Sequence, residues 1–397
     1  MHDTGFLHKW MKRAFCFMHT ARLAALSRAV QALLLGGRLT LTELGRARPG
    51  GAHVKHHIKS IDRLLGNAHL AAEREAVYRA ITHALLAGNV RPVILVDWAD
   101  CNPGHRFLML RAAVAIHGRA IPIYEEVHPL SRYNSPKTHA AFLKTLAQIL
   151  PPECRPIMVT DAGFRGPWFR AVERLGWDWV GRVRNQVKCS TDGQTWTYTE
   201  SLYRTASPRP RYLGHGALSH KRPYRCHLYL VRAHVRGPGR PPKSHGRGGA
   251  AHRCRKQHRD PWLIATSLPH TAASARRVIK LYALRMKIEE SIRDTKSHRF
   301  GFALHYARSA RIARLEALLL IGALALMALI LFGLSVSRLG IHRHLQANTE
   351  RRKTVLSIVF LGRQVLRWMR YLPPPRELLR ALRDLPSLII AQQPIRA

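Results

Sequence analysis

The sequence has 397 residues, of which 46% are apolar, enough to bury a core and to form two or three domains. Its 65 Lys and Arg residues against 23 Asp and Glu give a formal charge of +42. A field this positive opposes compaction unless a polyanion is the usual partner, so the charge favours nucleic acid as the partner over an anionic membrane or a ribosome. The composition excludes a disordered chain.

Residues 1–90 are predicted to be helical and basic. Helices are expected at residues 21–35, from residue 39, at 54–65 and at 71–86. The helix at 54–65 places its apolar residues on one face and Lys and His on the other. A helix-turn-helix-like DNA reader and a plain basic bundle fit this pattern equally well.

The period then changes from helix to strand. Two short apolar runs each end on an aspartate, Asp97 and Asp161. Around them the sequence predicts three strands, at residues 92–97, 107–116 and 120–127, and then a helix at 135–150. A strand at 155–161, a helix at 163–175 and a fifth strand at 177–184 follow. This order predicts an α/β core with a mixed sheet covered by helices.

From residue 188 to about 260 the pattern becomes short, alternating and punctuated by Gly and Pro, which predicts an inserted, mostly β subdomain. Its basic stretch Gly239-Arg240-Pro241-Pro242-Lys243 is interpreted as a surface loop, with a minor-groove arm as the alternative.

Residues 317–334 are all apolar or Gly, long enough to be considered as a membrane span. Small residues every few positions and Arg-rich flanks favour a central helix buried on all sides. Basic amphipathic helix is expected at 340–370, and a last short helix follows the prolines at 373–375.

The six cysteines are scattered without a C-x-x-C pair, which is typical of a reducing cytosol. His252, Cys254 and His258 form at most part of a zinc site, a minor alternative. The N-terminus shows no evident secretory signal, so a cytoplasmic location is expected.

Acidic residues are rare here, so those at structured positions are candidates for chemistry. Asp97 and Asp161 end buried strands, and Glu289 lies on a predicted helix at 281–300. Carboxylates that converge need cations between them, and carboxylate oxygens suit Mg²⁺ or Mn²⁺. Two such ions support phosphoryl transfer on DNA. Asp100 is the main alternative to Asp97, and a strand-end cap is the alternative role for each aspartate.

In one continuous helix, Tyr282, Arg285, Glu289 and Lys296 would share one face. These four residues match the pattern Y-x2-R-x3-E-x6-K at every spacing. On this signature, and on the stretches around Asp97 and Asp161, at 261–269 and at 345–367, the chain resembles the DDE insertion-sequence transposases.

The resemblance implies an RNase H-like α/β fold interrupted by a β-rich insertion, with an N-terminal helical DNA-binding domain and C-terminal helices. It implies that the DNA-binding domain is residues 1–90 and that the catalytic core has two parts, residues 91–187 and 271–340. The insertion is then residues 188–270, and the C-terminal helical region is residues 341–397. It further implies a metal-binding triad of Asp97, Asp161 and Glu289, loaded with Mg²⁺ or Mn²⁺.

The implied activity is cut-and-paste transposition, with nicking, hairpin formation and opening, and strand transfer. Tyr282, Arg285 and Lys296 are then expected to contact DNA, as their chemistry allows. Trp262 is expected to stack on a flipped base. The implied partners are transposon ends and target DNA, with a homodimer in the DNA complex, no membrane, and a bacterial, nucleoid-associated location. An inactive end-binding regulator is the alternative function.

Overall fold

The computed structural model divides into two compact units, each described by itself below. Unit 1 comprises Met1–Pro156 and Met286–Gln393, and unit 2 comprises Ile157–Arg285 and Pro394–Ala397. The structure describes residues 4–184, 187–232, 260–271, 274–299, 301–347, 349–350, 354–368 and 371–394. The zinc alternative at His252, Cys254 and His258 and the stretch 239–243 lie outside these residues. The expected domain boundaries stay predictions.

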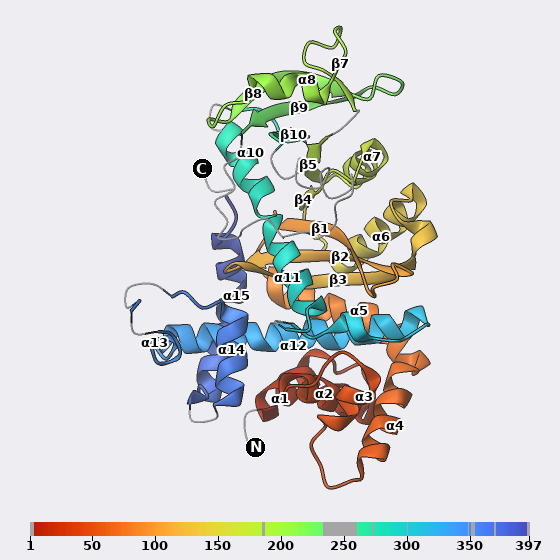
Figure 1. Cartoon of the computed structure of the whole chain (residues 1–397), viewed down its shortest axis with the longest axis vertical. Helices are drawn as coiled ribbons and strands as arrows, with labels where there is room; N and C mark the ends of the chain where they lie inside the picture. The colour runs from red at the N-terminus through yellow and green to blue at the C-terminus, as the bar shows by residue number, and fades with distance from the viewer. Residues whose placement is uncertain are drawn as a thin grey trace, which may run out of the picture. The chain divides into compact units, whose positions relative to one another are not determined.

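Unit 1 begins with five helices, in the region where helices were predicted (Figure 1): α1 (Thr4–Ala14), α2 (Thr20–Leu34), α3 (Leu41–Arg46), α4 (Val54–Leu65) and α5 (Ala68–Leu86). The side chains of Thr40 and Asn67 cap α3 and α5 by accepting hydrogen bonds from backbone N–H groups. Helix α4 buries Ile61, Leu64 and Leu65 on one face, as its sequence pattern predicts. On the other face it exposes Lys55, His56, Lys59 and Arg63. Whether α3 and α4 read DNA stays a prediction.

The three antiparallel strands of unit 1 are β1 (Val93–Asp100), β2 (Phe107–Ile116) and β3 (Arg119–Pro129), in the order β3-β2-β1. His117 and Gly118 both have positive φ, which gives the tight turn between β2 and β3 the twist that a two-residue hairpin needs. The register places Asp97 opposite Arg111, and Arg111 opposite Glu125. These three residues therefore share one face of the sheet.

Further helices of unit 1 follow the sheet along the chain. They are α6 (Pro136–Ile149), α11 (Met286–Lys296), α12 (Ile312–Arg338), α13 (His342–Leu345), α14 (Ile358–Arg367) and α15 (Pro375–Ala391). Of these, α6, α11, α12 and α15 pack on the sheet. Helix α11 packs on β1, β2 and β3, and α12 packs on β3 and on helices from both ends of the chain. By length and composition α12 could cross a membrane, but its most apolar eighteen-residue window is completely buried in the protein. The structure thus supports the central buried helix.

The crossing of α12 and α14 depends on two glycines. A Cβ atom on Gly333 would collide with the backbone of Ile358, and one on Gly362 with the backbone of Leu329. Only glycine lets the two helices approach this closely, so the small residues in the apolar run serve helix packing.

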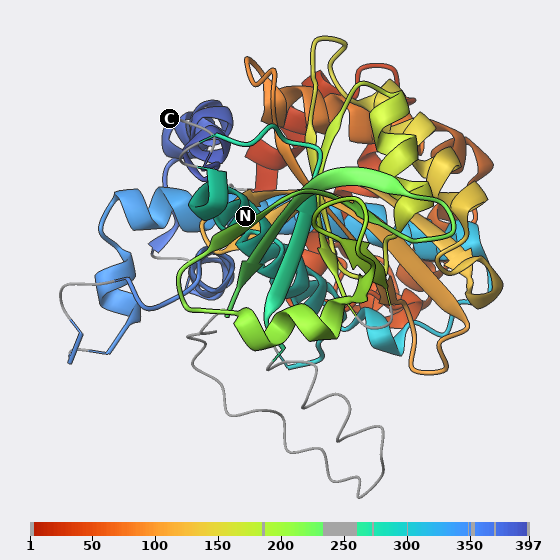
Figure 2. The ribbon, with the colours of Figure 1, turned by 90° about the horizontal axis from the view of Figure 1, so that it is seen from above.

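The described residues of unit 2 form a seven-stranded mixed sheet in the order β4-β5-β10-β9-β8-β6-β7 (Figure 1; Figure 2 shows β8, β9 and β10 from above). Strands β4 and β5 pair in parallel, and the other neighbouring strands of this sheet pair antiparallel. The strands are β4 (Ile157–Thr160), β5 (Asp178–Val183), β6 (Lys188–Ser190), β7 (Thr197–Tyr198), β8 (Arg211–Leu218), β9 (Tyr224–Val231) and β10 (Trp262–Thr266). The α-helices among the described residues of this unit are α7 (Gly166–Arg174), α8 (Thr199–Leu202) and α10 (Ser274–Ala283).

Two helices cover opposite faces of this sheet. On one face, Phe169 of α7 stacks on Trp179 of β5 with ring centroids 3.9 Å apart, and a Cβ on Gly181 would touch the ring of Phe169. On the other face, α10 packs on β4, β5, β9 and β10. Because side chains alternate along a strand, Arg182 of β5 points to the α10 face.

The predicted α/β fold class is confirmed, since a mixed sheet is flanked by helices. The chain order of β1, β2, β3, α6, β4, α7 and β5 is the order that the sequence predicts. The β-rich insertion is also present in the described residues 187–232, between β5 and its sheet neighbour β10.

Three expectations were wrong. Strand β1 runs on to Asp100, so Asp97 lies within the strand and does not end it. The region 340–370 holds two helices, α13 and α14, and the described residues between them are not helical. The predicted continuous helix at 281–300 is two helices, α10 and α11, separated at Leu284 and Arg285. The amides of these two residues bond to the carbonyls three residues earlier, which tightens the chain into a turn. The reason is packing: Leu281 and Tyr282 are buried in unit 2, while Ile288 and Ser291 are buried in unit 1. The shared helical face predicted for the four signature residues therefore does not exist.

Candidate active site

Asp97 follows the fully buried residues Val93–Val96 of β1 and is itself half-buried. The backbone N–H of Trp98 donates a hydrogen bond of 2.9 Å to its Oδ1. This bond fixes the orientation of one carboxylate oxygen. The apolar strand thus delivers a carboxylate to the edge of the core, where it is neither buried among apolar groups nor fully exposed.

Glu289 lies in the first turn of α11, the helix that packs on the sheet of unit 1. It is half-buried and lines a cleft of about 470 Å³ within that unit. Lys296, nearly two full turns further along the helix, lines the same cleft. The other lining residues include Arg293, His298, His305 and Tyr306. The cleft therefore holds one candidate metal ligand and several groups suited to phosphate.

Asp100, the alternative to Asp97, contacts two basic side chains. Its Oδ2 lies 3.0 Å from Nζ of Lys296, and its Oδ1 lies 2.9 Å from Nδ1 of His105. Burial by itself raises the pKa of Asp100, but the hydrogen bonds from Lys296 and His105 outweigh it, and the pKa lies below its ordinary value. Asp100 is thus engaged by the signature lysine, an interaction that the sequence did not indicate.

Asp161 follows β4 in unit 2 and is half-buried. Its Oδ1 accepts a 2.9 Å hydrogen bond from the backbone N–H of Gly163, which orients this carboxylate as Trp98 orients that of Asp97. Burial is the main cause that raises the pKa of Tyr282, and the negative charge of Asp161 raises this pKa further. Asp161 and Tyr282 therefore lie near one another in unit 2.

Tyr282, Arg285 and Trp262 form a cluster in unit 2. The rings of Trp262 and Tyr282 meet edge to face with centroids 4.9 Å apart, and the Arg285 guanidinium lies 5.9 Å from the Tyr282 ring. Tyr282 is only 2% exposed, and burial raises the pKa of its hydroxyl, while Arg285 and Arg182 act to lower it. The cluster joins two aromatic rings to two guanidinium groups on the α10 face of the sheet.

A buried ion pair next to Asp97 escaped sequence reasoning. Arg111 and Glu125 face each other on β2 and β3, 2.7 Å apart, with side chains 1% and 0% exposed. The Arg111 guanidinium also donates to the hydroxyls of Ser291 and Thr295 on α11. The available signal was the presence of charged residues inside two otherwise apolar strands, Arg111 in Phe107–Ile116 and Glu125 and Glu126 in Arg119–Pro129. Arg111, which lies opposite Asp97 in the sheet, therefore connects β2 to α11, the helix that carries Glu289.

The predicted site residues divide between the two units. Asp97, Glu289 and Lys296 lie in unit 1, and Asp161, Trp262, Tyr282 and Arg285 lie in unit 2. Within either unit, the described residues contain no group of three or more His, Cys, Asp or Glu placed to hold a metal ion. The donor set nonetheless fits a hard divalent cation, because all three candidates are half-buried carboxylates and two have an oxygen oriented by a backbone amide.

Comparison with known proteins identifies the family. A cryo-EM structure of the piggyBac transposase synaptic complex with hairpin DNA is similar at 11% identity and a TM-score of 0.42, covering 97% of this chain and 82% of that chain. A likeness of that size does not establish a shared fold. No curated protein matched the sequence. The family described as "Transposase DDE domain" matches residues 90–327, more than half of the chain and the segment that contains all seven predicted site residues. The chain therefore belongs to the transposase DDE domain family.

Proposed function

We propose that the chain is the transposase of a bacterial insertion sequence, which binds the terminal inverted repeats of its element and moves it by cut-and-paste transposition. The observation that supports this most strongly is the presence of Asp97, Asp161 and Glu289 together with the Y-R-E-K signature in a chain of the transposase DDE family. The charge of +42 suits a protein that handles several DNA segments.

In this proposal Asp97, Asp161 and Glu289 hold two Mg²⁺ ions, for which Mn²⁺ can substitute. When bound, the ions supply charge neutralisation at the scissile phosphate and a more reactive water or 3′-hydroxyl. The protein contributes orientation: the amides of Trp98 and Gly163 hold one oxygen of each aspartate in place. The packing of α11 on β1 holds Glu289 within the same unit as Asp97.

The reaction sequence follows as part of the proposal. Water attacks the phosphorus at the transposon end, and the 3′-oxygen leaves as a hydroxyl. That hydroxyl attacks the opposite strand, forming a hairpin and releasing the flanking DNA. A second water opens the hairpin, and the freed 3′-hydroxyl attacks a target phosphodiester. Each step forms one P–O bond and breaks one, so the chemistry depends on positioning and charge neutralisation more than on covalent groups from the protein.

Arg285 and Lys296 bind phosphates near the cleaved end, and Tyr282 adds a hydrogen bond. Trp262 provides a platform for a base displaced during hairpin formation. Its half-buried ring, held edge to face against Tyr282, suits such a platform because its orientation is already fixed. Two ends must be cut together, so the active complex contains two copies of the chain, acting in the bacterial nucleoid.

A catalytically inactive regulator that occupies transposon ends without cutting them is the second candidate. It would share the charge and the DNA contacts but not the need for three carboxylates. The intact triad favours the enzyme.

The deciding experiment uses a labelled duplex that carries the end of the native element, with Mg²⁺ or with EDTA. Wild type, Asp161→Asn and Glu289→Gln are compared with Asp192→Asn, which changes an exposed turn aspartate of unit 2. We expect metal-dependent nicking followed by a hairpin product for wild type and Asp192→Asn, and neither product for the two triad variants. End binding, measured by gel shift, should survive in all four proteins. Tight end binding by wild type without cleavage in Mg²⁺ or Mn²⁺ would support the regulator instead.

A further inference from the structure

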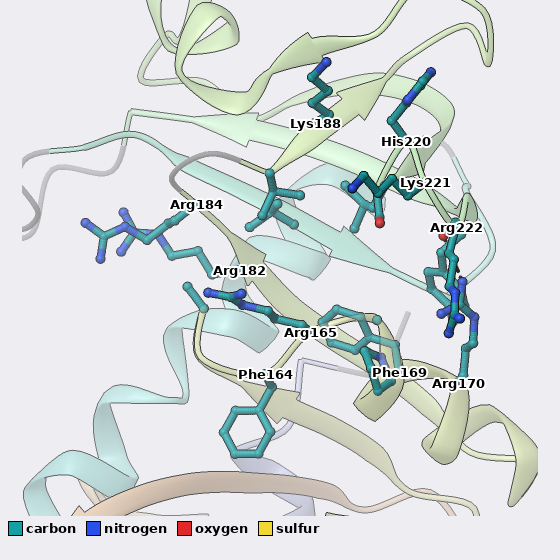
Figure 3. Close-up of a pocket in the computed structure, with 18 of the residues that line it drawn as sticks. Phe164, Arg165, Phe169, Arg170, Arg182, Arg184, Lys188, His220, Lys221 and Arg222 are labelled. Carbon is teal, nitrogen blue, oxygen red and sulfur yellow. Dashed lines mark hydrogen bonds between the residues drawn. The ribbon is translucent and has the colours of Figure 1, made fainter. Parts of the chain in front are cut away.

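Unit 2 contains a second basic site, a cleft of about 660 Å³ (Figure 3). It lies on the side of the sheet covered by α7. One wall is the start of α7, with Arg165 and Arg170. The other wall is β6 and the turn between β8 and β9, with Lys188, Lys221 and Arg222. We call this site the α7 cleft.

The two walls are held together by one side chain. Arg170 donates a 2.9 Å hydrogen bond to the carbonyl oxygen of Arg222, and its guanidinium lies 5.1 Å from the Tyr224 ring centroid. The turn is tied to β6 as well, because the amide of Ser219 bonds to the carbonyl of Lys188. The cleft is therefore formed in the protein alone and needs no ligand to shape it.

The charge of the α7 cleft is almost uncompensated. Its lining contains six Arg or Lys side chains besides Arg182, and no Asp or Glu. Arg184 is paired with Asp260 at 3.0 Å. Among the residues that the structure describes, Lys188, Lys221 and Arg222 make no ion pair with a carboxylate, and all three are exposed. Such a rim attracts an anion strongly.

The floor of the cleft is apolar. Phe169, Val183 and Leu218 are all buried. An apolar floor behind exposed cations lowers the local dielectric constant and so strengthens their attraction for phosphate. A cleft that is preformed and cationic along both walls fits the phosphate backbone of DNA.

The α7 cleft and the Trp262–Tyr282 cluster lie on opposite faces of the same sheet. Val183 lines the cleft on the α7 face. Its neighbour Arg182 borders the cleft as well, but the alternation of β5 turns the Arg182 side chain to the α10 face, where it interacts with Tyr282. A duplex that lies along one face of a sheet does not reach the other face. The two sites therefore suit two different DNA segments.

We propose that the α7 cleft binds the backbone of target DNA while the α10 face binds the transposon end. This proposal rests on the proposed function, which requires one protein to hold both segments during strand transfer. The transferred end supplies the attacking 3′-hydroxyl, and the target supplies the phosphodiester, so a separate site for the target keeps the end in place while a target is found.

The test compares the triple variant Lys188→Ala/Lys221→Ala/Arg222→Ala with a matched control, Arg204→Ala/Arg209→Ala/Arg211→Ala. The control removes the same charge from three exposed arginines of unit 2 outside the cleft. The first readout is the salt dependence of binding to a duplex that lacks the end sequence. The slope of log K against log salt should fall by about 0.9 for each phosphate that the protein no longer neutralises. It should therefore fall by about 2.7 for the cleft variant and by much less for the control.

The second readout is strand transfer of precleaved ends into a plasmid, beside cleavage of the native end. The cleft variant should lose strand transfer at least tenfold and keep end cleavage within about twofold. Equal salt slopes for cleft variant and control would overturn the proposal, as would a loss of end binding that matches the loss of target binding. The thermal unfolding midpoint of each variant checks the fold. If wild type cleaves no ends, the proposed function fails, but the two salt slopes still decide whether the α7 cleft holds DNA.

Discussion

Nζ of Lys296 lies 3.0 Å from Oδ2 of Asp100, so the signature lysine is paired with a carboxylate in the protein without DNA. The two side chains are 20% and 29% exposed, on α11 and at the end of β1. A phosphate that binds Lys296 must therefore compete with Asp100, and the pair sets how readily the lysine engages DNA.

Asp100→Asn should bind a transposon end more tightly, because it releases Lys296 and removes a negative charge that repels phosphate. A partly exposed ion pair is worth about 1 kcal/mol or less, so the gain should be about fivefold or smaller. Titration of a labelled end in a gel-shift assay measures it. Lys296→Ala is the control, because it should change the affinity in the opposite direction and weaken binding of the end. Weaker binding by Asp100→Asn would mean that Asp100 holds Lys296 in its DNA-binding position.

The same pair should stabilise the fold only above acidic pH. The pKa of Asp100 is lowered in the folded protein, so its contribution is present above the ordinary pKa of 3.8 and disappears as pH falls through the lowered value. Wild type should therefore unfold at a higher temperature than Asp100→Asn at about pH 7, and the difference should shrink towards zero below about pH 3. Thermal unfolding followed by circular dichroism at both pH values tests this; a difference that stays undiminished in acid would assign it to another cause.

The buried pair Arg111–Glu125 should be costly to break. Arg111→Met leaves the Glu125 carboxylate charged and buried, with the Tyr78 hydroxyl as one remaining donor, which should cost about 3–5 kcal/mol of unfolding free energy. The double variant Arg111→Met/Glu125→Met should lose much less than the sum of the two single variants.

Urea denaturation of the two single variants and the double variant measures this coupling. The exposed pair Arg46–Glu43 on α3 is the control, since Arg46→Met should cost only about 0.5 kcal/mol. Additive losses for Arg111 and Glu125 would show that the two charges do not compensate each other.

Trp262→Ala should slow hairpin formation more than first-strand nicking, because only the hairpin step requires a displaced base. Loss of stacking should cost roughly 1–3 kcal/mol, or about 5- to 150-fold in the hairpin step. Trp262→Phe keeps an aromatic face against Tyr282 and should recover most of the rate. Single-turnover assays on intact and prenicked ends separate the two steps, and equal slowing of both steps would rule out the stacking role.

The sequence by itself determined the local elements and the candidates for chemistry. The strand at 107–116 has the predicted bounds, because a mostly apolar run of this length between two turns favours a buried strand. The apolar run in Ile312–Arg338 is a buried helix, since its small residues and polar flanks suit a protein core. The positions of Asp97 and Asp161 after the apolar parts of β1 and β4 followed from the same patterns.

Only the tertiary structure decided what these elements contact. The break at Leu284 and Arg285 has neither Pro nor Gly as a signal; it arises because the two halves of the predicted helix are buried in different units. The pairing of Lys296 with Asp100 joins residues 196 positions apart, and the α7 cleft joins Arg170 to a turn 52 positions later. Periodicity reports only which face of an element is buried, whereas ion pairs and clefts depend on which distant element packs against that face.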